Sequence, residues 1–312
     1  MKDLRTIGFF LLCAANLARP ALASGAMDAL YTALQGKDQC VSFTWEQGDG
    51  EEGRKGIDVP LTLDGQQKSF RLDTSSDVST VWGSPPGHDG QSSYNAGNIQ
   101  IGSSVISHPL LAIGSGGQNE DGMLGLQTLV GWITVIDYAD EKFCLFQAAD
   151  VPPEVMAANW TDAELRGLKL MLPIAMNGLS GKDIIFDTGA SDIDLEVDFD
   201  IWKSLTGIED TEQAPIQDTI LGTSIPMIAA PAQGSMTIAG VTEDSTEVFT
   251  VPDTPNQYAQ TYGAGGVTGN KPFWDGAVVM DLSTAKTFNY VFTTELQIKL
   301  GWPQHARFGV IE

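Results

Sequence analysis

The stretch KDIIFDTGASDIDL, residues 182–195, decides the fold because it carries an aspartate out of an apolar run into a tight turn. Ile184, Ile185 and Phe186 predict a buried strand, and Asp187 follows directly, at the head of Asp-Thr-Gly. Asp and Gly are common in ordinary turns, so a lone Asp-Thr-Gly is usually not catalytic. The function of this turn therefore depends on whether the chain supplies a second group that could work with Asp187.

The chain contains a second copy of the same pattern. The segments VPLTLDGQQKSFRLDTSS (59–76) and LPIAMNGLSGKDIIFDTGAS (172–191) each have a proline, an alternating apolar run, an Asp-Gly or Asn-Gly dipeptide, a second apolar run and Asp-Thr. Such a dipeptide between alternating hydrophobic residues predicts a β-hairpin with a type I′ turn, in which both central residues have positive φ. We therefore expect two equivalent hairpins, one ending at Asp73 and the other at Asp187.

A second pair of matching segments lies downstream. GMLGLQTLVGWITVIDY (122–138) and GVTGNKPFWDGAVVMDL (266–282) both contain two glycines three residues apart, then an apolar strand and an aspartate. The spacing from the second glycine to Asp137 or Asp281 is 12 residues in each copy. Because both landmarks occur in the same order, the chain is expected to hold two copies of one β-rich unit.

Short, frequent strand patterns predict an all-β protein with two similar lobes and a cleft between them. The expected boundaries are an N-terminal lobe over residues 24–150, a connector over 151–168 and a C-terminal lobe over 169–312. Helix is expected only in FDIWKSLTG (199–207) and in the residues after Thr161. Phe273 and Trp274 are expected in the core.

Residues 1–23 resemble a secretory signal peptide. Lys2 and Arg5 precede an apolar run that is too short to span a bilayer and that ends in an A-x-A pattern. A lipoprotein anchored through Cys13 is the alternative, but Leu12 stands where a small residue is wanted. Removing residues 1–23 takes away a net charge of +2 and changes the formal charge from −23 to −25. So acidic a chain argues against nucleic acid or an anionic membrane as partner.

Two cysteines, Cys40 and Cys144, remain after the leader. In an oxidising compartment they predict one disulfide, with a metal-binding pair as the alternative. The acidic run DIDLEVDFD (192–200) has oxygen-bearing side chains in alternation, as calcium sites do, but it lacks a central glycine and is interpreted as an acidic strand face. No cofactor or metal is expected.

Other catalytic patterns are absent from the sequence. The three histidines, His88, His108 and His305, form no motif with a nucleophilic serine or cysteine. The glycine-rich segment GSGGQNEDG (114–122) lacks the Lys-Ser/Thr of a phosphate-binding loop. The paired aspartates, Asp73 and Asp187, therefore remain the candidate catalytic residues.

The paired motifs resemble those of the pepsin-like aspartic proteases. In that family each lobe gives one Asp-Thr-Gly loop and a later apolar-apolar-Gly strand behind it. IIFDTGAS and GMLGL match these elements well, whereas RLDTSSDVSTVWGS has one departure and VTG (267–269) is a weaker copy. The resemblance covers roughly residues 55–295. Retroviral-type proteases share the motifs in a single lobe and dimerise, so two copies in one chain favour the pepsin-like arrangement and a monomer.

The resemblance implies that Asp73 and Asp187 form a pair that holds the attacking water. One carboxyl acts as general base and the other as general acid, and two adjacent carboxyls share one proton. Thr74 and Thr188 would lock the two loops together. The remaining loop positions, expected to support the pair, are Ser75, Ser76, Gly189 and Ala190. A protein or peptide substrate, acidic pH and a secreted or periplasmic location are the matching expectations.

The sequence departs from the family pattern at two places. Ser75 stands where the family has glycine, and a Cβ there would cost about 1–3 kcal/mol if φ were positive. The family also closes a hairpin flap over the substrate, whereas residues 83–98 form only a short segment in which Tyr94 is the candidate flap residue. These departures leave a catalytically inactive pepsin-fold binding or inhibitor protein as the alternative function.

Overall fold

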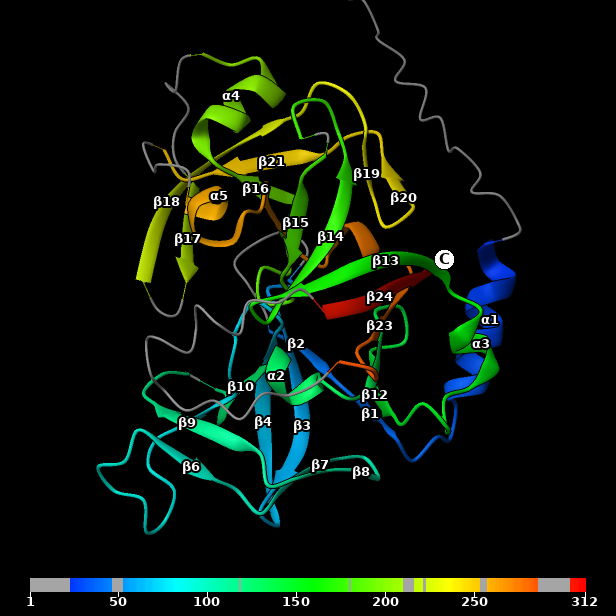
Figure 1. Cartoon of the computed structure of the whole chain (residues 1–312), viewed down its shortest axis with the longest axis vertical. Coiled ribbons are helices and arrows are strands. Elements are labelled where there is room, and N and C mark those ends of the chain that lie inside the picture. Colours follow the sequence, from blue (N-terminus) through cyan, green and yellow to red (C-terminus); the bar gives the residue numbers. More distant parts are fainter. Residues whose placement is uncertain are drawn as a thin grey trace, which may run out of the picture.

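The computed structural model describes residues 23–46, 53–117, 119–179, 181–209, 216–220, 223–252, 257–285 and 304–312. These residues form mostly strands, arranged in two sheets (Figure 1). The predicted all-β class with two lobes is confirmed. The predicted signal peptide lies outside the described residues, except for Ala23. None of the described helices is long and apolar enough to cross a membrane.

The first sheet has nine strands and belongs to the first half of the chain. Its order is β6-β9-β5-β10-β4-β3-β7-β8, and β2 pairs with β3. The strand bounds are β2 Thr44–Glu46, β3 Gly56–Leu63, β4 Gln66–Asp73, β5 Thr80–Trp82, β6 Ser93–Asn95, β7 Asn98–Ile101, β8 Ser104–Ser107, β9 Leu110–Gly114 and β10 Gly122–Gly125.

The second sheet has fifteen strands and spans the junction between the two halves as well as the second lobe. Its main path is β1-β12-β11-β23-β24-β13-β14-β15-β22-β16-β21-β18-β17, with β19 and β20 branching from β14. The strand bounds are β1 Cys40–Ser42, β11 Ile133–Asp137, β12 Lys142–Phe146, β13 Asn159–Arg166, β14 Lys169–Ala175, β15 Asp183–Phe186, β16 Leu195–Val197, β17 Ile216–Ile220, β18 Thr223–Pro231, β19 Met236–Ile238, β20 Val241–Glu243, β21 Glu247–Thr250, β22 Gly266–Thr268, β23 Ala277–Asp281 and β24 Gln304–Ile311.

The described helices are short: α1 Ala23–Leu34, α2 Leu126–Leu129, α3 Pro153–Met156, α4 Phe199–Thr206, α5 Gln257–Tyr262 and the 3₁₀ turn η1 Lys271–Phe273. Helix α4 confirms the helix predicted in FDIWKSLTG. The helix predicted after Thr161 is wrong, because that segment forms strand β13 and pairs with both β14 and β24. Its helix-forming residues are overridden by tertiary pairing, which buries Ala163 and Leu165 on alternate positions.

The first predicted hairpin is confirmed in detail. Strands β3 and β4 pair up to Leu63 and Gln66, and the two residues between them have φ of 49° at Asp64 and 81° at Gly65. Both values are positive, as a type I′ turn requires. This tight turn fixes the register of β4 and therefore the position of Asp73 at its end.

The second hairpin has a longer connection than predicted. Strands β14 and β15 pair at Met171–Ile185 and stop at Pro173–Asp183, so the loop between them is not a two-residue turn. Of the Asn-Gly pair, only Gly178 has positive φ. The type I′ prediction is wrong here, because the end of β14 leaves β15 to pair with β19.

The two downstream landmarks occupy equivalent places behind the two loops. Strand β10 runs parallel to β4, with Gly125 beside Asp73. Strand β22 runs parallel to β15, with Thr268 beside Phe186, and one further residue along this register Gly269 lies beside Asp187. The repeat seen in the sequence is therefore a repeat in space.

The last strands of the two copies join the lobes. Strand β11 pairs antiparallel with β23 so that Ile133 faces Asp281 and Asp137 faces Ala277, which relates the two copies by a local two-fold axis. Phe273 and Trp274 are buried, as expected. On the other side of this junction, α1 packs Leu30 against the sheet, and α1 and α3 lie side by side in Figure 1.

The predicted disulfide is confirmed and braces this junction. Cys40 and Cys144 are bonded at 2.04 Å and face each other in the pairing of β1 with β12. The bond closes a loop with a sequence separation of 104 residues. It therefore ties the start of the first lobe to the strands at its end.

Candidate active site

The carboxyl group of Asp73 is held by three donors from its own loop. The backbone amides of Ser75 and Ser76 each donate to Asp73 Oδ1 at 2.9 Å, and Ser75 Oγ donates to the same oxygen at 2.8 Å. Hydrogen bonds to a carboxylate stabilise its charged form. The loop therefore fixes the orientation of the Asp73 carboxyl group.

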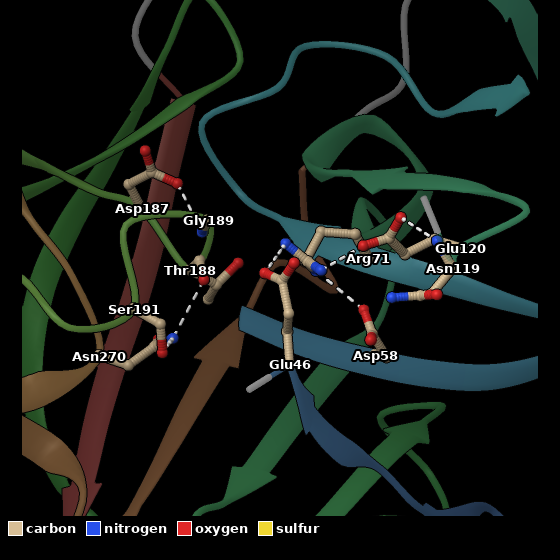
Figure 2. A network of polar contacts seen from close by, with 10 residues as sticks. All are labelled: Glu46, Asp58, Arg71, Asn119, Glu120, Asp187, Thr188, Gly189, Ser191 and Asn270. Atoms are coloured by element: carbon tan, nitrogen blue, oxygen red, sulfur yellow. Dashed lines mark hydrogen bonds and ion pairs between the residues drawn. The ribbon is translucent and has the colours of Figure 1, made fainter. Parts of the chain in front are cut away.

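Asp187 has a sparser set of donors. Its backbone amide donates to the Thr268 carbonyl at 2.9 Å, which anchors the loop to β22. The Gly189 amide donates to Asp187 Oδ1 at 2.7 Å, and the amide of Ala190 donates to the Asp187 carbonyl at 3.2 Å. Figure 2 shows the contact between Asp187 and Gly189.

The two predicted catalytic carboxyls are brought together. Both carboxyl groups border the same space above Gly189. A Cβ placed at Gly189 would lie 3.0 Å from Asp187 Oδ1 and 3.1 Å from Asp73 Cγ, so only glycine leaves both groups undisturbed. Burial, followed by the negative charge of Asp73, raises the pKa of Asp187 to about 7. The pair can therefore carry one proton over a wide acidic range.

Ser75 fits its loop without backbone strain. Its φ lies outside the left-handed region, so the cost expected for a Cβ at a positive φ does not arise. Its hydroxyl instead becomes an extra donor to the carboxyl pair, since it contacts Asp73 and also lowers the pKa of Asp187. Ser76 Oγ points elsewhere and donates to the Val78 carbonyl at 3.2 Å.

The two predicted locking residues, Thr74 and Thr188, are completely buried and bond across the lobes. The Thr74 amide donates to Thr188 Oγ1, and the Thr188 amide donates to Thr74 Oγ1, each at 3.0 Å. Thr74 Oγ1 also donates to the Phe186 carbonyl at 2.8 Å, which reaches the strand that carries Asp187. These bonds fix one loop against the other.

The second glycine of each downstream landmark is required by close packing. A Cβ at Gly125 would lie 2.9 Å from the Ser76 carbonyl oxygen, and one at Gly269 would lie 1.7 Å from the Ala190 carbonyl oxygen. Ser76 and Ala190 hold equivalent places, three residues after their aspartates. Strands β10 and β22 therefore each pack directly against one of the two loops that carry the paired aspartates.

Tyr94 is not placed as a flap residue. It lies in β6, which pairs with β9, and its side chain is buried in the core of the first lobe. Burial raises the pKa of its hydroxyl to about 12. The prediction is corrected on this point, because a flap side chain must be free to move over the substrate.

A buried network that the sequence did not reveal supports the second loop (Figure 2). Asn270 Nδ2 donates to the Thr188 carbonyl at 3.1 Å and to Ser191 Oγ at 2.9 Å. Asn270 Oδ1 in turn accepts from the hydroxyl of Tyr138 at 2.8 Å. The corresponding position in the first copy is Leu126, so the repeat comparison gave no signal for a polar residue here.

A second network braces the strand that leads to Asp73 (Figure 2). The guanidinium of Arg71 pairs with Asp58 and Glu46, each at 2.8 Å, and with Glu120. These partners come from β3, β2 and the loop before β10. Because Arg71 lies two residues before Asp73, the network stabilises the end of β4.

Only residues 195–197 of the acidic run after Asp187 form a strand, β16. Asp194 and Glu196 face the protein interior, whereas Asp192 and Asp200 are exposed. Asp194 accepts the Glu247 amide at 2.9 Å, and Glu196 accepts the Tyr258 hydroxyl at 2.5 Å. Both acids are buried. They are therefore held by protein groups rather than presented as an exposed face.

Comparisons with known proteins give a limited result. No protein-family model and no curated protein sequence matches the chain. Among solved structures, the chain is similar to the crystal structure of the aspartic proteinase from Irpex lacteus, with 13% sequence identity and a TM-score of 0.46. The similarity covers 87% of this chain and 96% of that one.

Proposed function

We propose that the chain is an aspartic endopeptidase that hydrolyses peptide bonds with a water activated by Asp73 and Asp187. The observation that carries this proposal is the meeting of the two carboxyls, one from each lobe, within 3.4 Å of a Cβ placed at Gly189. Burial and the charge of Asp73 raise the pKa of Asp187 to about 7 in this setting. Two adjacent carboxyls that share one proton supply a base and an acid at the same time.

The donors around each carboxyl suggest which one plays which role. Asp73 accepts three hydrogen bonds and is suited to act as the base that takes a proton from water. The water oxygen attacks the peptide carbonyl carbon, while Asp187 gives its proton to the carbonyl oxygen. Collapse of the resulting neutral diol breaks the C–N bond, and the amine leaves with a proton from the pair. No cofactor takes part in these steps.

The setting that we propose follows the sequence. The leader and the disulfide fit a secreted or periplasmic protein, and the duplicated lobe fits a monomer with its substrate cleft between the lobes. Substrates are proteins or peptides. Activity is expected from acidic pH up to about 7, where the pair loses its shared proton.

The test is cleavage of a mixed peptide library between about pH 3 and pH 9, read by mass spectrometry. Asp73→Asn and Asp187→Asn are expected to abolish cleavage, because each removes one half of the acid–base pair. Asp200→Asn is the matched control, since Asp200 is an exposed acid on α4. Cleavage that survives in both pair variants would contradict the proposal.

A second candidate function is a pepsin-fold binding or inhibitor protein without catalysis. It is favoured by the burial of Tyr94, which leaves the first lobe without its predicted flap residue. A folded wild-type protein that cleaves nothing in the library at any pH would support this alternative.

A further inference from the structure

Lys169 contacts the loop that follows Asp73, although no motif includes it. It begins β14, whose residue Met171 pairs with Ile185 of β15. Two residues further along this antiparallel register, Lys169 stands across from Asp187. The sequence signal is weak, because Lys169 in LKLML reads as an ordinary polar position of an alternating strand.

The ammonium group of Lys169 reaches into the loop of the other lobe. It donates to the carbonyl oxygen of Ser75 and pairs with Asp77 Oδ1 at 2.6 Å. It also lies 5.2 Å from the centre of the Tyr262 ring, a cation–π distance. Only 8% of the side chain is exposed. A cation from the second lobe thus holds the loop that carries Asp73.

The same position in the first copy is different. Gly56 precedes Pro60 by four residues, as Lys169 precedes Pro173, so the two are equivalent. Glycine gives the first lobe no side chain with which to hold the Gly189 loop in return. The contact is therefore a one-sided addition to the symmetric lock formed by Thr74 and Thr188.

If the side chain at position 169 only filled space in the fold, an apolar residue would serve better than a lysine. Burying an ammonium group carries a large desolvation cost that only good partners offset. The partners here belong to the loop that follows Asp73, within two residues of Ser75, whose hydroxyl donates to Asp73. The cation therefore acts on one of the two loops whose geometry the proposed chemistry needs.

We propose that Lys169 is a positioning residue that fixes the first catalytic loop from the opposite lobe, a role that rests on the proposed protease function. By holding the Ser75 carbonyl, it orients the peptide unit whose Ser76 amide donates to Asp73, and it keeps the Ser75 hydroxyl aligned on the same oxygen. Loss of Lys169 is therefore expected to loosen the Ser75 hydroxyl, whose hydrogen bond lowers the pKa of Asp187.

The first test compares Lys169→Met, Lys169→Arg and the distant control Lys203→Met on a cleaved peptide. Small misplacement of a catalytic group can cost about 100-fold in rate, so Lys169→Met is expected to lower kcat by about 10- to 100-fold with KM changed less than about 3-fold. Lys169→Arg keeps a donor and a charge and is expected to stay within about 5-fold of wild type. A kcat unchanged in Lys169→Met would overturn the role.

The pH profile separates positioning from mere support of the fold. Loss of the cation in Lys169→Met is expected to move the high-pH limb of kcat/KM to higher pH. Asp77→Asn removes the ion-pair partner that holds Lys169 and is expected to move the limb in the same direction by a smaller amount, which also covers the case in which Lys169→Met does not fold. Limbs that stay in place in both variants would overturn the proposal, because a structural role changes stability without moving them.

An independent readout does not need activity. The carbonyl carbon of Ser75 is expected to shift upfield in the NMR spectrum of Lys169→Met, because it loses its hydrogen bond from the ammonium. An unchanged Ser75 carbonyl shift would contradict the contact itself. If wild type cleaves nothing while the Ser75 shift moves as expected, the failure lies in the proposed protease function, and the loop contact still holds.

Discussion

Thr74 and Thr188 each accept, through the side-chain hydroxyl, the backbone amide of the other at 3.0 Å. Each threonine directly follows one of the paired aspartates, and both are completely buried. These two hydrogen bonds fix the position of Asp73 relative to Asp187, although the two residues belong to different lobes. A chain built from two copies needs such a link if its two carboxyls are to share a proton.

The first prediction concerns this link. Thr188→Val keeps the shape of the side chain but leaves the buried Thr74 amide without its acceptor. An unsatisfied buried donor costs about 1–3 kcal/mol, so we expect a loss of that size in the free energy of unfolding. We also expect kcat to fall by about 10-fold or more, because the carboxyls lose their alignment. Urea unfolding and peptide cleavage measure the two effects.

Thr250→Val is the matched control for this substitution. Thr250 is also a completely buried threonine, but its hydroxyl has no hydrogen-bond partner among the described residues. Removing that hydroxyl is expected to leave stability equal or higher and activity unchanged. Equal losses of unfolding free energy and of kcat in Thr188→Val and Thr250→Val would show that the Thr74–Thr188 hydrogen bonds contribute no more than any buried threonine hydroxyl.

The second prediction concerns stability and pH. The folded protein raises the pKa of Asp187 to about 7, so folding favours its protonated form. This contribution is fully present below the ordinary aspartate pKa of about 4 and is lost as the pH rises through about 7. Asp187→Asn removes the charge and is therefore expected to stabilise the fold by about 1–3 kcal/mol at pH 8 and by little at pH 4. Thermal unfolding across this pH range measures the difference.

Asp121→Asn provides a control of opposite sign. Burial alone would raise the pKa of Asp121, but hydrogen bonds from Lys68 and from the Ser69 amide outweigh it and lower that pKa. Its carboxylate therefore stabilises the fold at neutral pH, and the substitution is expected to destabilise it there. A destabilising Asp187→Asn at pH 8 would refute the buried, shared-proton description of the pair.

The third prediction concerns the serine that replaces the family glycine. Ser75 Oγ donates to Asp73 at 2.8 Å and lowers the pKa of Asp187. Ser75→Gly removes this donor and is expected to move the high-pH limb of kcat/KM to higher pH. Ser76→Ala is the control, because Ser76 Oγ donates to the Val78 carbonyl and its amide bond to Asp73 is retained. The same limb in Ser75→Gly and wild type would count against a role for the hydroxyl.

The fourth prediction concerns the disulfide. The Cys40–Cys144 bond closes a loop of 104 residues, and cross-links of this span are expected to restrict the unfolded chain strongly. The Cys40→Ser/Cys144→Ser double variant is expected to lose about 2–5 kcal/mol of unfolding free energy. Its kcat is expected to stay close to wild type at temperatures where it is folded, because the bond braces β1 and β12 rather than the catalytic loops. A large loss of kcat in the folded variant would contradict this separation.

The sequence predicted the features that depend on local pattern and on repetition. Three such features were predicted correctly: the Asp64-Gly65 turn, the two aspartates at strand ends and helix α4. They could be predicted because turn-forming residues and hydrophobic periodicity act over only a few residues. The pairing of Cys40 with Cys144 followed from there being only two cysteines after the leader. These features were enough to place both carboxyls in related loops.

Features that depend on contacts between residues far apart in the sequence could not be predicted. The segment after Thr161 has helix-forming residues, but its backbone forms hydrogen bonds with the two neighbouring strands β14 and β24. The sequence offers Tyr94 as a flap residue, but its ring is buried in the core of the first lobe. Asn270 and Lys169 break the symmetry of the repeat, so comparison of the two copies could not reveal them.

The measurement that tests the central claim most directly is the pH dependence of kcat/KM on the peptide that wild type cleaves best. A shared-proton pair of Asp73 and Asp187 predicts a rate that is high at acidic pH and falls as the pH rises through about 7. It also predicts no cleavage by Asp187→Asn at any pH. A rate that keeps rising above pH 7, or cleavage retained in Asp187→Asn, would contradict the account.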